Sequence, residues 1–257
     1  MNLDLQTRTA LFEFLLRLGD DRLVLGHRLS EWCGHAPVLE EDIALTNIAL
    51  DEIGQAAAFL HLAGEVEAKH RTEDDLAYFR EATHFRNVQL IEQPNGDFAL
   101  TIVRQFFFDT YSYLLLDELQ KSTYVHLAGI AAKGFKEATY HLRHSKEWML
   151  RLGDGTEESH RKVQDAVNNL WRFTTELFLF DEVEQRLASQ GIIPNLENLH
   201  QRWMEIADAV LSSATLTIPP EETYPVSGSR KGKHSEHLGH LLAEMQILAR
   251  SYPDARW

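Results

Sequence analysis

Apolar residues recur along most of the chain at spacings of three and four, which is the pattern of α-helices that bury one face. Few prolines interrupt these stretches, and no stretch alternates between apolar and polar residues as a half-buried strand does. The pattern therefore predicts a helical protein. The expected helices cover about residues 7–32, 39–67, 98–119, 124–152, 156–189, 199–213 and 235–252, with a short helix capped by Thr72 and Asp75 and an irregular loop at 217–233.

Several of these helices are long and joined by short connections. A helix of 25 to 30 residues measures roughly 40 Å at 1.5 Å per residue, and such helices pack as a bundle. The sequence contains no internal repeat, low-complexity tract or interdomain linker. It predicts an all-α fold with a four-helix core and additional peripheral helices, forming a single domain over residues 1–257.

The composition limits the classes of function. The chain has 39 acidic and 25 basic residues, for a formal net charge of -14, which argues against nucleic-acid binding. Its single cysteine, Cys33, excludes an intrachain disulfide. No run of about 18 apolar residues occurs, so we expect no membrane span. The first residues read as a helix rather than a signal peptide, so we expect a cytoplasmic protein.

Polar residues interrupt the apolar faces of the long helices. The interrupting residues are Asp51, Asp109, Glu137 and His141. A buried carboxylate is costly unless a metal, a cation or hydrogen bonds compensate it. Inward carboxylates on four long helices are typical of di-iron bundles, in which two helices each supply one Glu and the other two each supply Glu-x-x-His.

The ligand spacing of a di-iron bundle is missing from this sequence. Three residues after Asp51, Glu52 and Glu137 stand Gly54, Gln55 and Tyr140, none of which is a histidine. Three interpretations remain: a working metal centre with unusual ligands, ordinary polar pairs, or an internal polar network that replaces a di-iron site. The third fits best, with Asp51, Asp109, Glu137 and His141 as its members and with no metal or other cofactor in this chain.

Two further features are candidate contacts with other molecules. Trp171 and Phe178 belong to an apolar segment with large side chains on several sides, which indicates either burial against another chain or a deeply buried helix. Arg230, Lys231 and Lys233 form a basic patch among glycines. This patch is either a contact for the phosphates of a coenzyme A held by a partner or a solvated loop.

Five long motifs resemble one known protein family, the C subunits of the bacterial ring-1,2-phenylacetyl-CoA epoxidases. The resemblance that they carry covers nearly the whole chain. They read LRLGDDRLVLGHRLSEWCGHAPVLEEDIALTNIALDEIGQA, LIEQPNGDFALTIVRQFFFD, KEATYHLRHSKEWMLRLGDGT, NNLWRFTTELF and KGKHSEHLGHLLAEMQILAR.

The resemblance implies a ferritin-like fold and a noncatalytic structural role in phenylacetate catabolism. In that family a homologous A subunit holds the di-iron site and the acyl-CoA, a small B subunit bridges, and a reductase with flavin and an iron–sulfur cluster supplies electrons from NADPH. We therefore expect a hetero-oligomer, or a homo-oligomer when the chain is alone, and no enzymatic activity of the isolated chain. The alternatives are a self-sufficient di-iron oxidase with atypical ligands and an iron-storage relative of ferritin.

Overall fold

The computed structural model describes residues 3–220 and 225–255 and divides the chain into two compact units. Unit 1 consists of Met1–Pro94, Phe180–Gln190 and Gly228–Trp257, and unit 2 of Asn95–Leu179 and Gly191–Ser227. The single domain over residues 1–257 stays a prediction. The structure does not describe residues 1–2, 221–224 and 256–257. All three ranges belong to the predicted domain, and 221–224 also belong to the loop predicted over 217–233.

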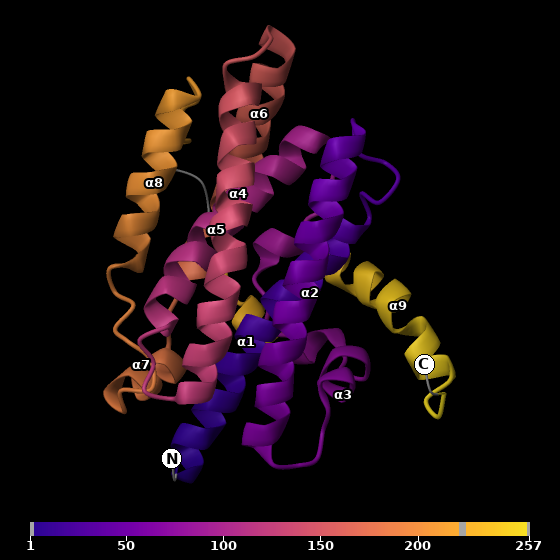
Figure 1. Cartoon of the computed structure of the whole chain (residues 1–257), viewed down its shortest axis with the longest axis vertical. Coiled ribbons are helices and arrows are strands. Elements are labelled where there is room, and N and C mark those ends of the chain that lie inside the picture. Colours follow the sequence, from indigo (N-terminus) through magenta and orange to yellow (C-terminus); the bar gives the residue numbers. More distant parts are fainter. Residues whose placement is uncertain (1–2, 221–224, 256–257) are drawn as a thin grey trace. The chain divides into compact units, whose positions relative to one another are not determined.

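Unit 1 is built on a pair of long helices, α1 (Leu5–Ser30) and α2 (Leu39–Glu67), which lie side by side (Figure 1). The side chain of Asp4 caps α1 by accepting a hydrogen bond from the backbone N–H of Thr7 at 2.8 Å. Acidic residues occupy the first turn of α2, where they complement the helix dipole.

Two glycines bring α1 and α2 close together. A Cβ atom placed on Gly19 would lie 2.7 Å from Cδ2 of Leu60, and one on Gly26 would lie 2.7 Å from Cγ1 of Ile53. Both distances are shorter than side-chain contacts allow. Since the two glycines are seven residues apart, they share one face of α1, and that face packs against α2 at two successive points.

Shorter elements complete unit 1. Helices α7 and α9 and the turn η2 pack against α1, and α9 also contacts α3 and η1. The α3 helix begins with the capping box of Thr72 and Asp75, as the sequence predicts. The bounds are α3 (Glu73–Tyr78), η1 (Ala82–His84), η2 (Gln89–Glu92), α7 (Glu182–Ser189), η4 (Ser229–Lys231) and α9 (Glu236–Ser251).

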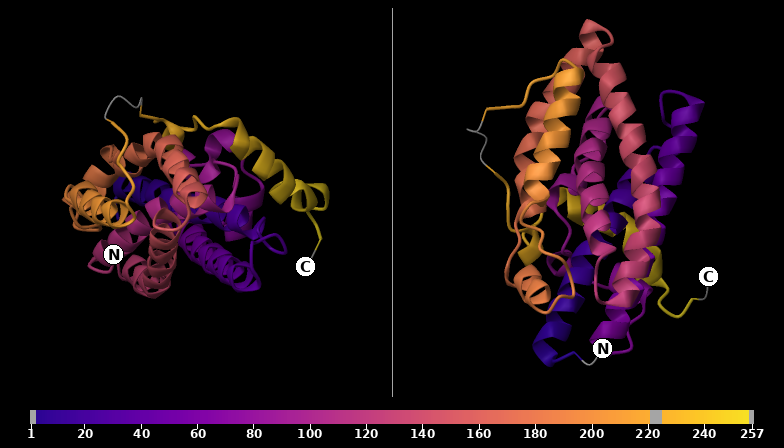
Figure 2. Two further views of the ribbon diagram at one scale, coloured as in Figure 1. Left: turned by 90° about the horizontal axis from the view of Figure 1, so that it is seen from above. Right: turned by 60° about the vertical axis from the view of Figure 1, so that its left-hand side comes forward.

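Unit 2 is built on a second pair of long helices, α4 and α5. Two shorter helices, α6 and α8, each pack against both of them, and Figure 2 shows α8 running alongside α4. The indole N–H of Trp203 on α8 donates a hydrogen bond to the backbone oxygen of Phe107 on α4 at 3.0 Å. The bounds are α4 (Phe98–Leu119), α5 (Val125–Gly153), α6 (Glu157–Leu170), η3 (Trp171–Phe178) and α8 (Leu199–Ser213).

The predicted continuous helix over 156–189 is wrong. The segment consists of α6, the 3-10 turn η3 and, after an interruption, α7. In a 3-10 turn residues three apart share a face, and in η3 this brings Thr174 and Leu177 into the interior. The side chain of Asp181 then caps a new helix, so a strong local start signal ends any continuation of the preceding one.

The predicted fold class, all-α and ferritin-like, is confirmed. Within the described residues every regular element is a helix or helical turn, and the four longest helices are α1, α2, α4 and α5. By length and composition alone α2 could cross a membrane. Helices in the cores of water-soluble proteins pass the same test, so this is weak evidence for a membrane span.

Candidate functional site

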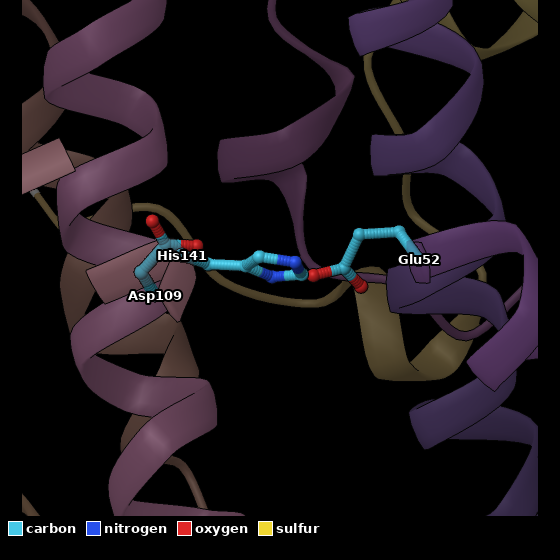
Figure 3. Close-up of side chains that lie close together, drawn as sticks. All are labelled: Glu52, Asp109 and His141. Atoms are coloured by element: carbon cyan, nitrogen blue, oxygen red, sulfur yellow. The ribbon is translucent and has the colours of Figure 1, made fainter. Parts of the chain in front are cut away.

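Unit 2 contains a buried pair of polar side chains on its two long helices. Asp109 lies on α4 and His141 on α5, and each is 1 % exposed. A carboxylate oxygen of Asp109 and a ring nitrogen of His141 lie within 4.8 Å of one another. Figure 3 draws both side chains. It also draws Glu52, which belongs to unit 1.

Hydrogen bonds occupy both carboxylate oxygens of Asp109. The amide of Gln105, one turn earlier on α4, donates to Oδ1 at 2.6 Å. The hydroxyl of Ser145 on α5 donates to Oδ2 at 2.7 Å. Asp109 therefore connects the two long helices of unit 2 through charge-assisted hydrogen bonds, which are stronger than hydrogen bonds between neutral groups.

The helical turn before His141 carries no buried carboxylate. Ala138, three residues earlier, is 2 % exposed and faces the interior. Glu137 is only half-buried, and its carboxylate lies 3.9 Å from the ammonium of Lys133 at the helix surface. Tyr140 is exposed. At the spacing of a Glu-x-x-His pair, His141 is thus preceded by alanine rather than by glutamate.

Unit 1 buries an arginine between its two long helices. Arg22 on α1 is fully buried, and its Nε–H donates a hydrogen bond to Oε1 of Gln55 on α2 at 2.8 Å. Its Nη1 donates to the backbone oxygen of Leu18 at 3.1 Å. Its guanidinium carbon lies 4.9 Å from the ring centroid of Phe59. Three contacts therefore fix the orientation of this cation.

The buried carboxylate on α2 is Glu52 rather than Asp51. Glu52 is 1 % exposed, whereas Asp51 is half-buried. Neighbouring residues on a helix point about 100° apart, so one position separates an interior side chain from one at the edge. Sequence reasoning named Asp51 because it lies in line with apolar residues. Glu52 could have been found from its spacing to Gln55, which is also buried.

The described residues do not fit a di-iron centre of the ferritin type, which needs a Glu from each of two helices and Glu-x-x-His from each of two others. In unit 1, α2 offers Glu52-x-x-Gln55, and the α1 side chain that contacts Gln55 is the cation Arg22. In unit 2, α4 offers Asp109 and α5 offers Ala138-x-x-His141. Among the described residues, none of the long helices α1, α2, α4 and α5 carries a complete Glu-x-x-His pair.

Two further buried carboxylates lie next to each other on α1. Asp20 forms an ion pair with Arg80, with Nη1 and Oδ2 3.0 Å apart, and Asp21 forms one with Arg230 at 2.8 Å. Burial raises the pKa of the Asp21 carboxyl, although the nearby Arg230 acts in the opposite direction. These pairs attach two distant segments of unit 1 to α1, and no pattern in the sequence indicates either partner.

The three residues of the predicted phosphate contact differ in exposure: Arg230 is largely buried, whereas Lys231 and Lys233 are at the surface. Arg230 ion-pairs with Asp21, and its side chain is only 11 % exposed. Its guanidinium is therefore turned into unit 1, which differs from the solvent-facing position expected of a phosphate contact. Lys231 and Lys233 are exposed.

The predicted partner contacts, Trp171 and Phe178, belong to an aromatic cluster of unit 2. The Trp171 ring centroid lies 5.6 Å from that of Trp203, and the Phe178 centroid lies 5.6 Å from the same ring. Phe178 also contacts His200, with centroids 4.7 Å apart. Both residues remain half-buried, so each has one side against its own unit and another that is accessible.

Comparisons with known proteins show the family of the chain. A family model described as "Phenylacetic acid catabolic protein" matches residues 2–257. A relative from Escherichia coli (strain K12), described as the C subunit of 1,2-phenylacetyl-CoA epoxidase, is 50% identical over 244 residues, which cover 95% of this chain and 98% of the relative. The resemblance drawn from the sequence is confirmed. The chain belongs to the family of phenylacetic acid catabolic proteins.

Proposed function

We propose that the chain is a noncatalytic structural subunit of a 1,2-phenylacetyl-CoA epoxidase that acts in aerobic phenylacetate degradation. The relative that is 50% identical is described as the C subunit of such an enzyme. The match covers 95% of this chain, and the family model matches residues 2–257, which include both long helix pairs.

The observation that carries the noncatalytic role is the absence of complete Glu-x-x-His pairs on the described long helices. Glu52 is followed by Gln55, and His141 is preceded by Ala138. Oxygen activation at a carboxylate-bridged di-iron centre needs both ligand types on the same helix face. Gln55 is bound to a buried guanidinium, which disfavours a metal cation beside it.

The proposed catalytic centre therefore lies in a partner. A homologous A subunit would hold the di-iron site and the acyl-CoA, a small B subunit would bridge, and a reductase with flavin and an iron–sulfur cluster would deliver electrons from NADPH. This chain would bind no cofactor. Its role is to support the catalytic subunit, because metal ligands keep their geometry only when the helices that carry them are held rigidly. We place the complex in the cytoplasm.

The η3 segment is our candidate for part of the partner interface. Trp171 and Phe178 are large and half-buried, and Leu179 beside them is 47 % exposed. Aromatic residues that are anchored on one side and accessible on the other are typical of binding hot spots. Their own packing within unit 2 means that any substitution there needs a folding control.

Reconstitution tests the proposed function. The catalytic subunit, the bridging subunit and the reductase are assayed for NADPH-dependent oxidation of phenylacetyl-CoA, with and without this chain. We expect the chain alone to consume neither phenylacetyl-CoA nor oxygen, and we expect it to be required for turnover by the assembly. Full turnover by the three other components would show that the structural role is wrong.

Variants in η3 test the interface separately. Trp171→Ala and Phe178→Ala are expected to weaken pull-down of the catalytic subunit and epoxidation together. Val125→Ala, at an apolar residue of the same unit that is 72 % exposed, is the matched control and is expected to leave both unchanged. Circular dichroism verifies folding. If folded η3 variants behave as wild type, the interface lies elsewhere while the structural role stands.

A further inference from the structure

Arg22 is a fully buried cation in the α1–α2 pair of unit 1. A guanidinium is always charged in proteins and presents five N–H donors in a rigid plane. Burying it is costly unless nearby groups compensate its charge. Its Nε–H donates to Gln55 at 2.8 Å, its Nη1 donates to the carbonyl of Leu18 at 3.1 Å, and it lies 4.9 Å from the Phe59 ring.

These three groups are neutral, whereas Glu52 is a buried carboxylate on the same helix as Gln55. Glu52 precedes Gln55 by three residues, and side chains at this spacing lie next to each other on one helix face. The α2 face that receives Arg22 therefore presents a carboxylate and an amide one turn apart. A metal-binding half of a ferritin-like bundle would present a carboxylate and an imidazole there.

We propose that Arg22 is a fixed counter-cation that stands where a metal ion would bind, and that Arg22 and Gln55 together keep the α1–α2 half of this fold free of metal. The proposal deepens the noncatalytic role and rests on it. Three differences from a metal-binding half each weaken metal binding. Arginine replaces a ligating carboxylate on α1, an amide replaces the imidazole, and the permanent positive charge repels a divalent cation while compensating Glu52.

The proposal predicts that reversing two residues opens a metal site. The double variant Arg22→Glu/Gln55→His supplies a carboxylate on α1 and an imidazole three residues after Glu52. Titration with Co²⁺ alone, followed by visible absorption and metal analysis, reports both binding and coordination. We expect about one Co²⁺ per chain in the double variant and none in the wild type. Adding Glu52→Gln to the double variant should weaken binding at least about tenfold, since it removes one ligand.

Two results would contradict the proposal. A folded double variant that binds no more Co²⁺ than wild type would overturn the proposal. So would stoichiometric Co²⁺ binding by the wild type that Glu52→Gln removes. Neither outcome depends on reconstituted turnover, so a failure here is distinguishable from a failure of the proposed function.

A second measurement covers the case in which the double variant does not fold. Urea midpoints are compared for Arg22→Met, Glu52→Gln and their combination. If Arg22 compensates Glu52, the combination should have a higher midpoint than Arg22→Met alone. Arg28→Met is the matched control, because Arg28 is also buried on α1 but pairs with the carboxylate of Glu31 and donates to the backbone oxygens of Glu92 and His237. Its effect should add to that of Glu52→Gln. If the effects of Arg22→Met and Glu52→Gln on the urea midpoint also simply add, the proposal is overturned.

Discussion

Asp109 illustrates at the residue scale how unit 2 tolerates a buried carboxylate. Gln105 and Ser145 each donate to one of its oxygens, at 2.6 and 2.7 Å. Buried donors that lose their acceptor cost about 1–3 kcal/mol each. The carboxylate therefore stabilises the packing between α4 and α5.

Asp109→Ala is expected to lower the free energy of unfolding by about 2–3 kcal/mol, because it leaves these donors without their acceptor. Glu137→Ala is the control on the neighbouring helix. It removes a half-buried residue whose ion pair with Lys133 is at the surface, and it should cost less than about 1 kcal/mol. Urea denaturation measures both. A loss at Glu137 as large as that at Asp109 would contradict this account.

His61, on the exposed side of α2, is a residue with a defined response to pH. Its hydrogen bond to Glu73, with Nδ1 and Oε2 3.0 Å apart, raises the pKa of the imidazole above its ordinary value of 6.5. The pKa of His61 is higher in the folded chain than in the unfolded chain, so the protonated imidazole stabilises the fold through its bond to Glu73. This stabilisation is fully present below the unfolded pKa and is lost as pH rises through the folded pKa.

An NMR titration of the His61 ring protons should therefore give a midpoint above that of a model histidine. In Glu73→Gln the carboxylate charge is absent, so the pKa of His61 should fall. An unchanged midpoint in that variant would show that another group causes the shift. The pair is exposed, so its effect on global stability should be small.

At the scale of elements, the helix ends were largely predictable from sequence and the interior partners were not. The Thr72 cap and the start of α4 after Asp97 depend on residues close in sequence. The break at η3 was missed because aromatic packing favours it, while the capping signal at Asp181 was overlooked.

Long-range pairing explains the remaining errors in the candidate site. Asp20 and Asp21 are visible in the sequence as carboxylates in the middle of a helix, but Arg80 and Arg230 lie 60 and 209 residues away from them. No periodic pattern connects residues at such separations. Arg22 was missed for a related reason, since arginine is rarely fully buried and its position next to acids suggests a solvated face.

Trp203 anchors α8 on α4, and a substitution at this residue tests that element. The side chain is fully buried among aromatic rings, and its N–H donates to Phe107. Trp203→Ala should cost about 3–5 kcal/mol through the cavity it leaves. Trp203→Phe, which keeps most of the ring but loses the hydrogen bond, should cost clearly less. Equal losses in thermal or urea denaturation would mean that the hydrogen bond, and not the packing, attaches α8.

At the scale of the whole molecule, each unit pairs two long helices through buried polar contacts, and neither pair carries a full set of iron ligands. A hydrogen bond from Arg22 to Gln55 connects α1 and α2, and one from Ser145 to Asp109 connects α4 and α5. In the α1–α2 pair, the hydrogen bond from Arg22 is accepted by Gln55, at the position where the ferritin-like plan would use an imidazole. Under the proposed function, such a chain would contribute shape and rigidity to an enzyme complex rather than chemistry.

The iron content of the purified wild-type chain, expressed alone in iron-replete medium and passed through gel filtration, tests the central claim most directly. The account predicts no stoichiometric iron, because both Glu-x-x-His pairs are incomplete and a guanidinium contacts Gln55, the residue at the histidine position of α2. Two iron ions per chain that survive gel filtration would contradict it.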